Sequence, residues 1–168
     1  MDHLTQLPYL IPNRKLTSIL LFLTVLAILF FSCTNSKKVA NAGNASYIEL
    51  ETTSCMGPCP VYKMTVSKEQ AVFIGTANVD MEGEYLTKLD GKSLELFESL
   101  MEPTKVDALE TSYKSTDMLD LPTTYLRIFD GDSMKTIMKY GDQPKALEPY
   151  FSFFNTLRKD KDWKKISE

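Results

Sequence analysis

The strongest constraint on the fold is a set of short segments in which apolar and polar side chains alternate. Residues 47–51 read YIELE, and residues 60–67 continue with the same period of two. Residues 71–76 are rich in β-forming side chains and follow after a short polar turn. A period of two places the apolar side chains on one face of a strand. These segments therefore predict neighbouring strands that each bury one face.

Two later regions extend the strand pattern. Residues 79–89 predict extended chain with a turn or bulge at Gly83, because glycine inside a strand marks such irregularities. Residues 124–130 and 134–140 flank Asp130-Gly131-Asp132. An Asp-Gly pair between two alternating segments predicts a β-hairpin.

Two other stretches change to the helical period. The first has Asp90 as its expected N-cap and Pro103 as its stop. Its apolar stripe is formed by Leu94, Phe97, Leu100 and Met101. The second has Pro149 in its first turn. Its apolar face is formed by Leu147, Tyr150, Phe151, Phe154 and Leu157. Residues 106–113 predict one further helical turn, and residues 114–122 an irregular segment.

The order of these elements predicts an α+β fold. Strands come first, followed by a helix, a hairpin and a last helix. This order is typical of an antiparallel sheet with two main helices packed on one face. We expect a single small domain at residues 46–158, which is large enough to form its own core. The charged residues 159–168 predict a solvated C-terminal tail.

Residues 1–32 predict a signal peptide. Arg14 and Lys15 precede the uncharged apolar run at residues 16–31. A positive segment, a short apolar core and a small residue before the cleavage point are typical of bacterial export signals. An uncleaved N-terminal anchor helix remains the alternative interpretation.

Cys33 is the expected site of lipidation. The FFSC sequence that ends at Cys33 resembles the lipobox of bacterial lipoproteins, although Phe30 stands where leucine is most common. Residues 33–45 are small and polar, and they predict a lipidated cysteine followed by a flexible tether. Acyl chains on Cys33 would anchor the protein to a membrane. We therefore expect it at the cell envelope, at the outer membrane, on the periplasmic or the surface face.

Charge and histidine content exclude several classes of function. Removing Asp2, Arg14 and Lys15 leaves 17 of 19 basic and 21 of 22 acidic side chains, a net charge of −4. This balance, without a basic stripe, argues against a nucleic-acid partner. The only histidine is His3, which falls in the predicted signal peptide. A mature chain without imidazole cannot form Ser-His-Asp or Cys-His catalytic sites, and we expect neither a metal nor a cofactor.

Cys55 and Cys59 leave three interpretations open. A zinc site needs four ligands or three plus water, and the mature chain has neither imidazole nor a second cysteine pair. A thiol-redox site usually has C-x-x-C spacing at a helix N-terminus, whereas C-x-x-x-C here leads into Pro60 and strand-forming residues. A disulfide suits an exported protein and would add only about 2 kcal/mol for so small a loop. The sequence favours a disulfide that fixes the shape of the loop.

The residues around the two cysteines are expected to shape this loop. Gly57 can supply a positive φ and Pro58 a fixed one, which would bring the two cysteines within bridging range. The backbone N–H groups of such a loop could also converge on an anion, or bond to water and neighbouring strands.

The motif made by Cys55, Gly57, Cys59, Pro60 and Tyr62 carries a family resemblance. Together with Phe73-Ile74-Gly75, Asp120-Leu121-Pro122 and the Pro144–Leu147 helix start, it resembles an uncharacterised domain family common in lipoproteins of the Bacteroidota. The resemblance covers residues 46–157. The turn at Lys68-Glu69-Gln70 lacks the glycine expected there. The resemblance implies location and fold, and no activity.

Three functions remain as hypotheses. The first is a non-enzymatic interaction or accessory module with an envelope protein as partner. The second is thiol–disulfide exchange through Cys55 and Cys59. The third is binding of a small anionic or glycan ligand beside the cysteine loop. Acidic pairs such as Asp117 with Asp120 and Asp130 with Asp132 are better explained by turn and capping bonds than by a calcium site.

Overall fold

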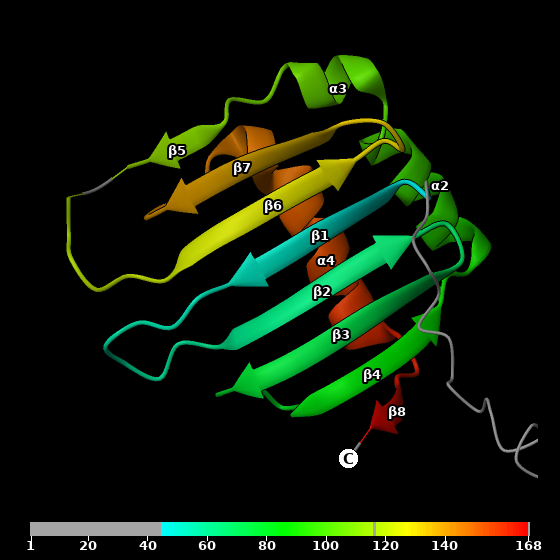
Figure 1. Cartoon of the computed structure of the whole chain (residues 1–168), viewed down its shortest axis with the longest axis horizontal. Helices are drawn as coiled ribbons and strands as arrows, with labels where there is room; N and C mark the ends of the chain where they lie inside the picture. Colours follow the sequence, from blue (N-terminus) through cyan, green and yellow to red (C-terminus); the bar gives the residue numbers. More distant parts are fainter. Residues whose placement is uncertain (1–44, 116, 168) are drawn as a thin grey trace, which may run out of the picture. The chain divides into compact units, whose positions relative to one another are not determined.

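The computed structural model describes residues 45–115 and 117–167, and the sheet they form is built around β1 (Tyr47–Thr52) (Figure 1). The strands of this sheet lie in the order β5-β7-β6-β1-β2-β3-β4-β8. Neighbouring strands are antiparallel, except that β5 and β7 run parallel. The other strands are β2 (Val61–Ser67), β3 (Gln70–Ala77), β4 (Gly83–Lys88), β5 (Ser112–Lys114), β6 (Thr123–Phe129), β7 (Met134–Tyr140) and β8 (Lys164–Ser167).

The two main helices, α2 and α4, pack on one face of the sheet, as the sequence predicts for an α+β fold (Figure 1). Asp90 caps α2 as predicted, because its Oδ1 accepts the N–H of Ser93 at 2.8 Å. Pro103 does not only end this helix; it also begins a short second one. The helical elements are α2 (Gly91–Leu100), α3 (Pro103–Asp107), the 3-10 turn η1 (Lys145–Leu147) and α4 (Glu148–Asp160).

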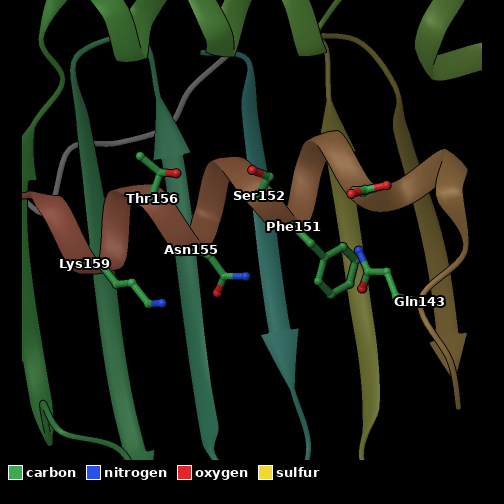
Figure 2. Close-up of a pocket in the computed structure, with 7 residues that line it drawn as sticks. Gln143, Phe151, Ser152, Asn155, Thr156 and Lys159 are labelled. Atoms are coloured by element: carbon green, nitrogen blue, oxygen red, sulfur yellow. The ribbon is translucent and has the colours of Figure 1, made fainter.

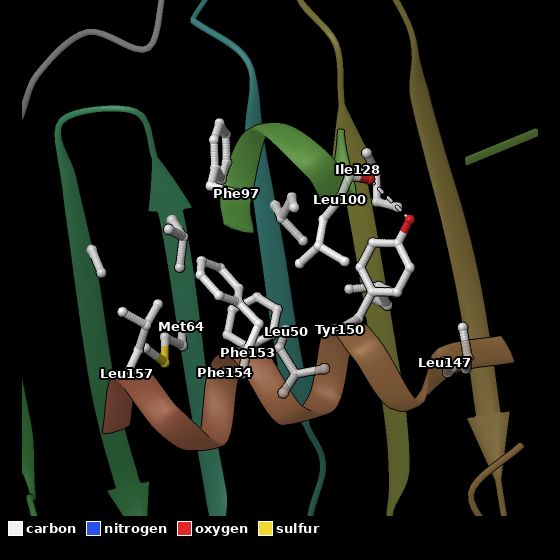
Figure 3. Packing of buried hydrophobic residues seen from close by; sticks show 14 of the residues in the cluster. Leu50, Met64, Phe97, Leu100, Ile128, Leu147, Tyr150, Phe153, Phe154 and Leu157 are labelled. Atoms are coloured by element: carbon white, nitrogen blue, oxygen red, sulfur yellow. Dashed lines mark hydrogen bonds between the residues drawn. The ribbon is translucent and has the colours of Figure 1, made fainter. Parts of the chain in front are cut away.

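The core lies between α4, α2 and the sheet (Figure 3). Phe154 and Leu157 of α4 are buried, and Phe97 of α2 is completely buried. The sheet contributes fully buried side chains from its inner strands, among them Ile48, Leu50, Met64, Phe73 and Leu126. Because Leu50 pairs with both Met64 and Leu126, the three strands present one continuous apolar surface to α4.

Tyr150 joins the two main helices. Its hydroxyl donates a hydrogen bond to the carbonyl oxygen of Leu100 at 2.9 Å, inside the core. Burial raises the pKa of Tyr150 to about 12, so the hydroxyl keeps its proton over the physiological range. The bond also satisfies one of the carbonyls that the C-terminal end of α2 leaves without a helical partner.

No described helix lies over the opposite face of the sheet (Figure 1). This face carries a charged network at its centre. Arg127 Nη1 donates to Glu49 Oε1 at 2.8 Å and to Glu51 Oε2 at 2.5 Å. The guanidinium also lies 5.2 Å from the centre of the Tyr125 ring. These contacts link β1 and β6 across the sheet.

The charged segment from residue 159, expected to be solvated, is ordered up to residue 167. It completes α4 and adds β8, which pairs with β4 at the edge of the sheet. Trp163 explains this, because its Nε1–H donates to the Leu157 carbonyl at 3.2 Å and its ring lies 5.9 Å from that of Phe73. Lys161 forms an ion pair with Asp90.

A second difference concerns residues 106–113. The helical turn expected there ends earlier, at Asp107, and Tyr113 belongs to β5. The Tyr113 hydroxyl accepts the N–H of Glu110 at 3.0 Å, which holds the bend between α3 and β5. A three-residue strand that pairs in parallel depends on distant residues, so a local pattern does not reveal it.

We predict that Trp163→Ala lowers the free energy of unfolding by about 1–3 kcal/mol, because the ring packs on Phe73 and holds β8 against the domain. Urea unfolding measures this change. The matched control is Lys165→Ala, an exposed position of the same strand, expected to stay within about 0.5 kcal/mol of the wild type. Equal free energies of unfolding for Trp163→Ala and Lys165→Ala would contradict this role of the Trp163 ring.

Candidate functional site

The cysteine loop connects β1 to β2 and is closed by a disulfide. Cys55 and Cys59 are bonded, with their Cα atoms 5.8 Å apart. Both cysteines are half-buried, whereas Met56, Gly57 and Pro58 between them are exposed. The tip of the loop is therefore exposed, and its two bonded cysteines are partly covered.

Thr52, the last residue of β1, clamps the base of this loop. Its hydroxyl donates to the carbonyl oxygen of Pro60 at 2.7 Å and accepts the N–H of Tyr62 at 3.2 Å. One side chain therefore fixes both the exit from the loop and the start of β2. The sequence gives no strong signal for this role, since a threonine at a strand end is common.

Asn78 holds the loop from a second direction. Its Nδ2 donates to the carbonyl oxygen of Cys59 at 3.1 Å, across 19 positions of sequence. Asn78 has a φ of 56°, in the left-handed region that asparagine tolerates better than most residues. An asparagine after a strand-like segment is the signal that sequence reasoning could have used here.

Gly57 does not play the part expected from the sequence. Its φ is not positive; among the described glycines, Gly83, Gly131 and Gly141 have positive φ. A Cβ added at Gly57 would meet only the Cys55 sulfur, at an ordinary 3.8 Å. The Gly57 N–H donates to that sulfur at 3.2 Å, so it is not directed at an external anion. Neither φ nor space requires glycine at this position.

Tyr62 belongs to the core side of the sheet rather than to the loop tip. Its ring is stacked on Phe73 with 5.3 Å between centroids, and the Arg158 guanidinium lies 5.9 Å from its centre. Burial raises the pKa of Tyr62, and the positive charge of Arg158 opposes that rise. Tyr62 therefore anchors the start of β2 in the domain.

Among the connections at the end of the sheet where β1 stops are residues 53–60, residues 78–82 and the described residues 117–122 (Figure 1). We call this end the loop edge. Thr53 ties the first of these loops to the start of β6, because its N–H donates to the Thr123 carbonyl at 2.9 Å and its Oγ1 accepts the Thr123 N–H at 3.0 Å. The Tyr140 hydroxyl supports the segment that contains Met118, because it donates to the Met118 carbonyl at 2.8 Å.

Apolar side chains are exposed on the loop edge. The exposed fractions are 84% for Met56, 63% for Met118 and 80% for Leu119. These are three of the six large hydrophobic side chains that are exposed in the described residues. Half of the exposed apolar side chains therefore come from two loops at one end of the molecule.

The surroundings of the disulfide do not activate a thiol. In the described part of the chain the loop leads from β1 into β2, so it does not place Cys55 or Cys59 at the N-terminus of a following helix, where a thiolate would be stabilised. The hydrogen bond that reaches Cys55 Sγ comes from the backbone of Gly57. The local geometry thus favours a structural bridge over a redox centre.

The predicted acidic pairs serve local structure. Asp130 Oδ1 accepts the N–H groups of Asp132 and Ser133, both at 2.8 Å, and so shapes the β6–β7 hairpin. These bonds hold the pKa of Asp130 below its usual value. Asp117 pairs with Lys114 at 2.7 Å. Among the described residues, no three Cys, His, Asp or Glu side chains gather in a way that could hold a metal ion.

Two hollows lie along α4, away from the cysteine loop. One, of about 380 Å³, follows the flank from which Phe151, Asn155 and Lys159 project towards the end of β1 (Figure 2). The other, of about 520 Å³, is an apolar groove between α2 and α4, with Leu96, Leu100 and Phe153 among its walls. Neither contains a group of catalytic side chains.

Residues 46–158 match a family described as a domain of unknown function, DUF6438. The chain belongs to this family. The match spans strands β1 to β7, α2, α3 and α4 up to Arg158, and leaves out β8. No curated protein matches the chain.

The N-terminal predictions concern a part of the chain that the structure does not describe. Cys33, the apolar run at residues 16–31 and most of the predicted tether lie outside residues 45–115 and 117–167. Within those described ranges, no helix combines the length and the apolar character that crossing a bilayer requires.

We predict that alanine has different effects on stability at Gly57 and at Gly75, two glycines that carry the family resemblance. Gly57→Ala should leave stability within about 0.5 kcal/mol, because the added Cβ has room. Gly75→Ala should cost more than about 3 kcal/mol, because its Cβ would lie 1.9 Å from the Met81 carbonyl oxygen. Urea unfolding of both variants checks this. A destabilised Gly57→Ala protein would mean that the loop needs glycine after all.

Proposed function

We propose that this chain is a cell-envelope lipoprotein whose domain is a non-enzymatic interaction module. Cys33 would carry the lipid anchor, and the loop edge would bind an envelope protein. The observation that carries the proposal is the exposure of Met56, Met118 and Leu119 at one end of the sheet. Single exposed apolar residues are common, but several on neighbouring loops that a sheet holds in place favour a contact with a partner.

The length of the expected tether is compatible with this arrangement. The predicted tether enters the domain before Tyr47, and β1 runs from there to the cysteine loop. At about 3.3 Å per residue, the six residues of β1 separate the loop edge from the tether by about 20 Å. Residues 33–45 could extend at most about 45 Å. A tether of this length would let the loop edge reach a partner at the membrane face.

The fixed shape of the loop edge also supports binding over electron exchange. The disulfide, Thr52 and Asn78 restrain the same loop, so a partner would meet a surface that is already ordered. Pre-ordering lowers the entropy lost on association. A thiol-redox function would instead require a bridge that opens readily and a thiolate stabilised by its surroundings.

The lipid anchor gives a first prediction. Cys33→Ala should move the protein from the membrane fraction to the soluble fraction or leave it as the uncleaved precursor, because the acylated residue is lost. Cell fractionation and intact mass measure both. Cys55→Ser is the matched control and should remain in the membrane fraction at the mature mass. A Cys33→Ala protein of unchanged mass in the membrane would favour the uncleaved anchor helix.

The loop edge gives a second prediction. A photo-crosslinking residue at position 56 or 119 should capture a discrete envelope protein in living cells. Positions 134 and 166 are matched controls, because Met134 and Ile166 are exposed apolar side chains on other parts of the sheet. We expect at least about fivefold more product from the loop edge than from the controls, as for a specific interface with a defined centre. Equal capture at all four positions would contradict the proposal.

A further inference from the structure

A third hollow lies where the end of α4 meets the turn before β4. Its volume is about 290 Å³, and it is lined by Phe73, Asp80, Met81, Arg158 and Lys159. The turn that contributes Asp80 and Met81 begins at Asn78, which holds the cysteine loop. Asp80 and Met81 therefore belong to the loop edge, but the exposed apolar side chains Met56, Met118 and Leu119 do not line the hollow.

Arg158 is the unusual group in this hollow. Its guanidinium lies over the Tyr62 ring, at 5.9 Å from the centroid. Its Nε is buried and has no hydrogen-bond partner within the described part of the chain, the single buried side-chain atom there of which this is true. A buried N–H without an acceptor opposes folding, so the other contacts of the side chain hold Arg158 in place. Because Nε itself is not accessible, a ligand in the hollow would meet the guanidinium at its Nη groups.

A structural role explains only part of this arrangement. Basic side chains in the last turn of a helix interact favourably with the helix dipole, and Arg158 and Lys159 both lie in the last turn of α4. That effect accounts for positive charge at this place. It does not account for two adjacent cationic side chains that both line one hollow beside the apolar Phe73 and Met81.

The charges around the hollow indicate the kind of ligand. Arg158 and Lys159 contribute two positive charges and Asp80 one negative charge. A monoanion would neutralise the net charge of +1 in the hollow. A dianion would leave an excess negative charge that the Asp80 carboxylate repels. The planar guanidinium matches a carboxylate in size and geometry. Phe73 and Met81 supply an apolar wall for the rest of the ligand.

We propose that this hollow binds a small carboxylate ligand with an apolar or aromatic body. The carboxylate pairs with Arg158 and Lys159, and the body packs against Met81 beside the Tyr62–Phe73 stack. Asp80 disfavours more highly charged anions. This proposal does not rest on the proposed partner, because it uses none of Met56, Met118 and Leu119.

The test follows the Arg158 Nε–H signal by NMR in the full chain, solubilised in detergent and labelled with ¹⁵N-arginine. The chain has three arginines, Arg14, Arg127 and Arg158, so the spectrum holds its own controls. Sodium benzoate is added against sodium chloride of equal ionic strength. We expect a saturable shift at Arg158 and none at Arg127, which Glu49 and Glu51 already neutralise.

Variants and a second anion sharpen this result. Lys159→Ala should weaken benzoate binding by about tenfold, the loss of one charge-assisted hydrogen bond, and Asp80→Asn should strengthen it. Lys164→Ala, an exposed lysine on β8, is the matched control and should change nothing. No saturable shift with benzoate, or an equal shift at Arg127, would overturn the proposal. Tighter binding of phenyl phosphate than of benzoate would overturn the assignment to a carboxylate.

Discussion

The packing of α4 across the inner strands is the interaction on which the rest of this structure depends. Phe154 and Leu157 lie on Leu50, Met64 and neighbouring side chains, and burial of each large apolar side chain contributes about 1.5–3 kcal/mol. This contact sets both the position of α4 and the face on which α2 can join the core. It also brings Arg158, at the end of α4, over the ring of Tyr62 at the start of β2.

The loop edge depends on the same sheet through its register. Thr52 of β1 is paired with both Tyr62 and Thr124, so the ends of three strands are fixed together. Polar contacts then extend this order into the loops, at about 1 kcal/mol for each hydrogen bond. The disulfide adds about 2 kcal/mol on the chain-entropy estimate. It is thus one restraint among several on the cysteine loop, and the core does not need it.

Much of the fold could be predicted because the signals were local. Alternation of apolar and polar side chains predicts β1, β2, β6 and β7. Asp90 predicts the start of α2, because its side chain accepts a hydrogen bond from the N–H of Ser93, three residues later. The order of the strands, the parallel pairing of β5 and the edge position of β8 could not be predicted in this way. They depend on contacts between distant residues, such as Trp163 on Phe73, that no local pattern contains.

The candidate site was predictable to a similar extent. The bridge between Cys55 and Cys59 follows from spacing and from the expected export, and the structure contains it. The role given to Gly57 was wrong, because the loop closes without a positive φ there, and Asn78 uses one instead. The hollow at Arg158 was missed, since its walls come from β3, the turn before β4 and α4. Such a site exists only after the sheet and α4 have packed.

The central proposal is that the Cys55–Cys59 bridge fixes a binding loop and does not exchange electrons. The reduction potential of this pair tests it most directly, measured by mass spectrometry of the purified protein in graded thiol buffers. We predict a value below about −300 mV, the range of structural disulfides in exported proteins. A value between about −270 and −120 mV, the range of thiol oxidoreductases, would contradict it and make electron exchange the function to pursue.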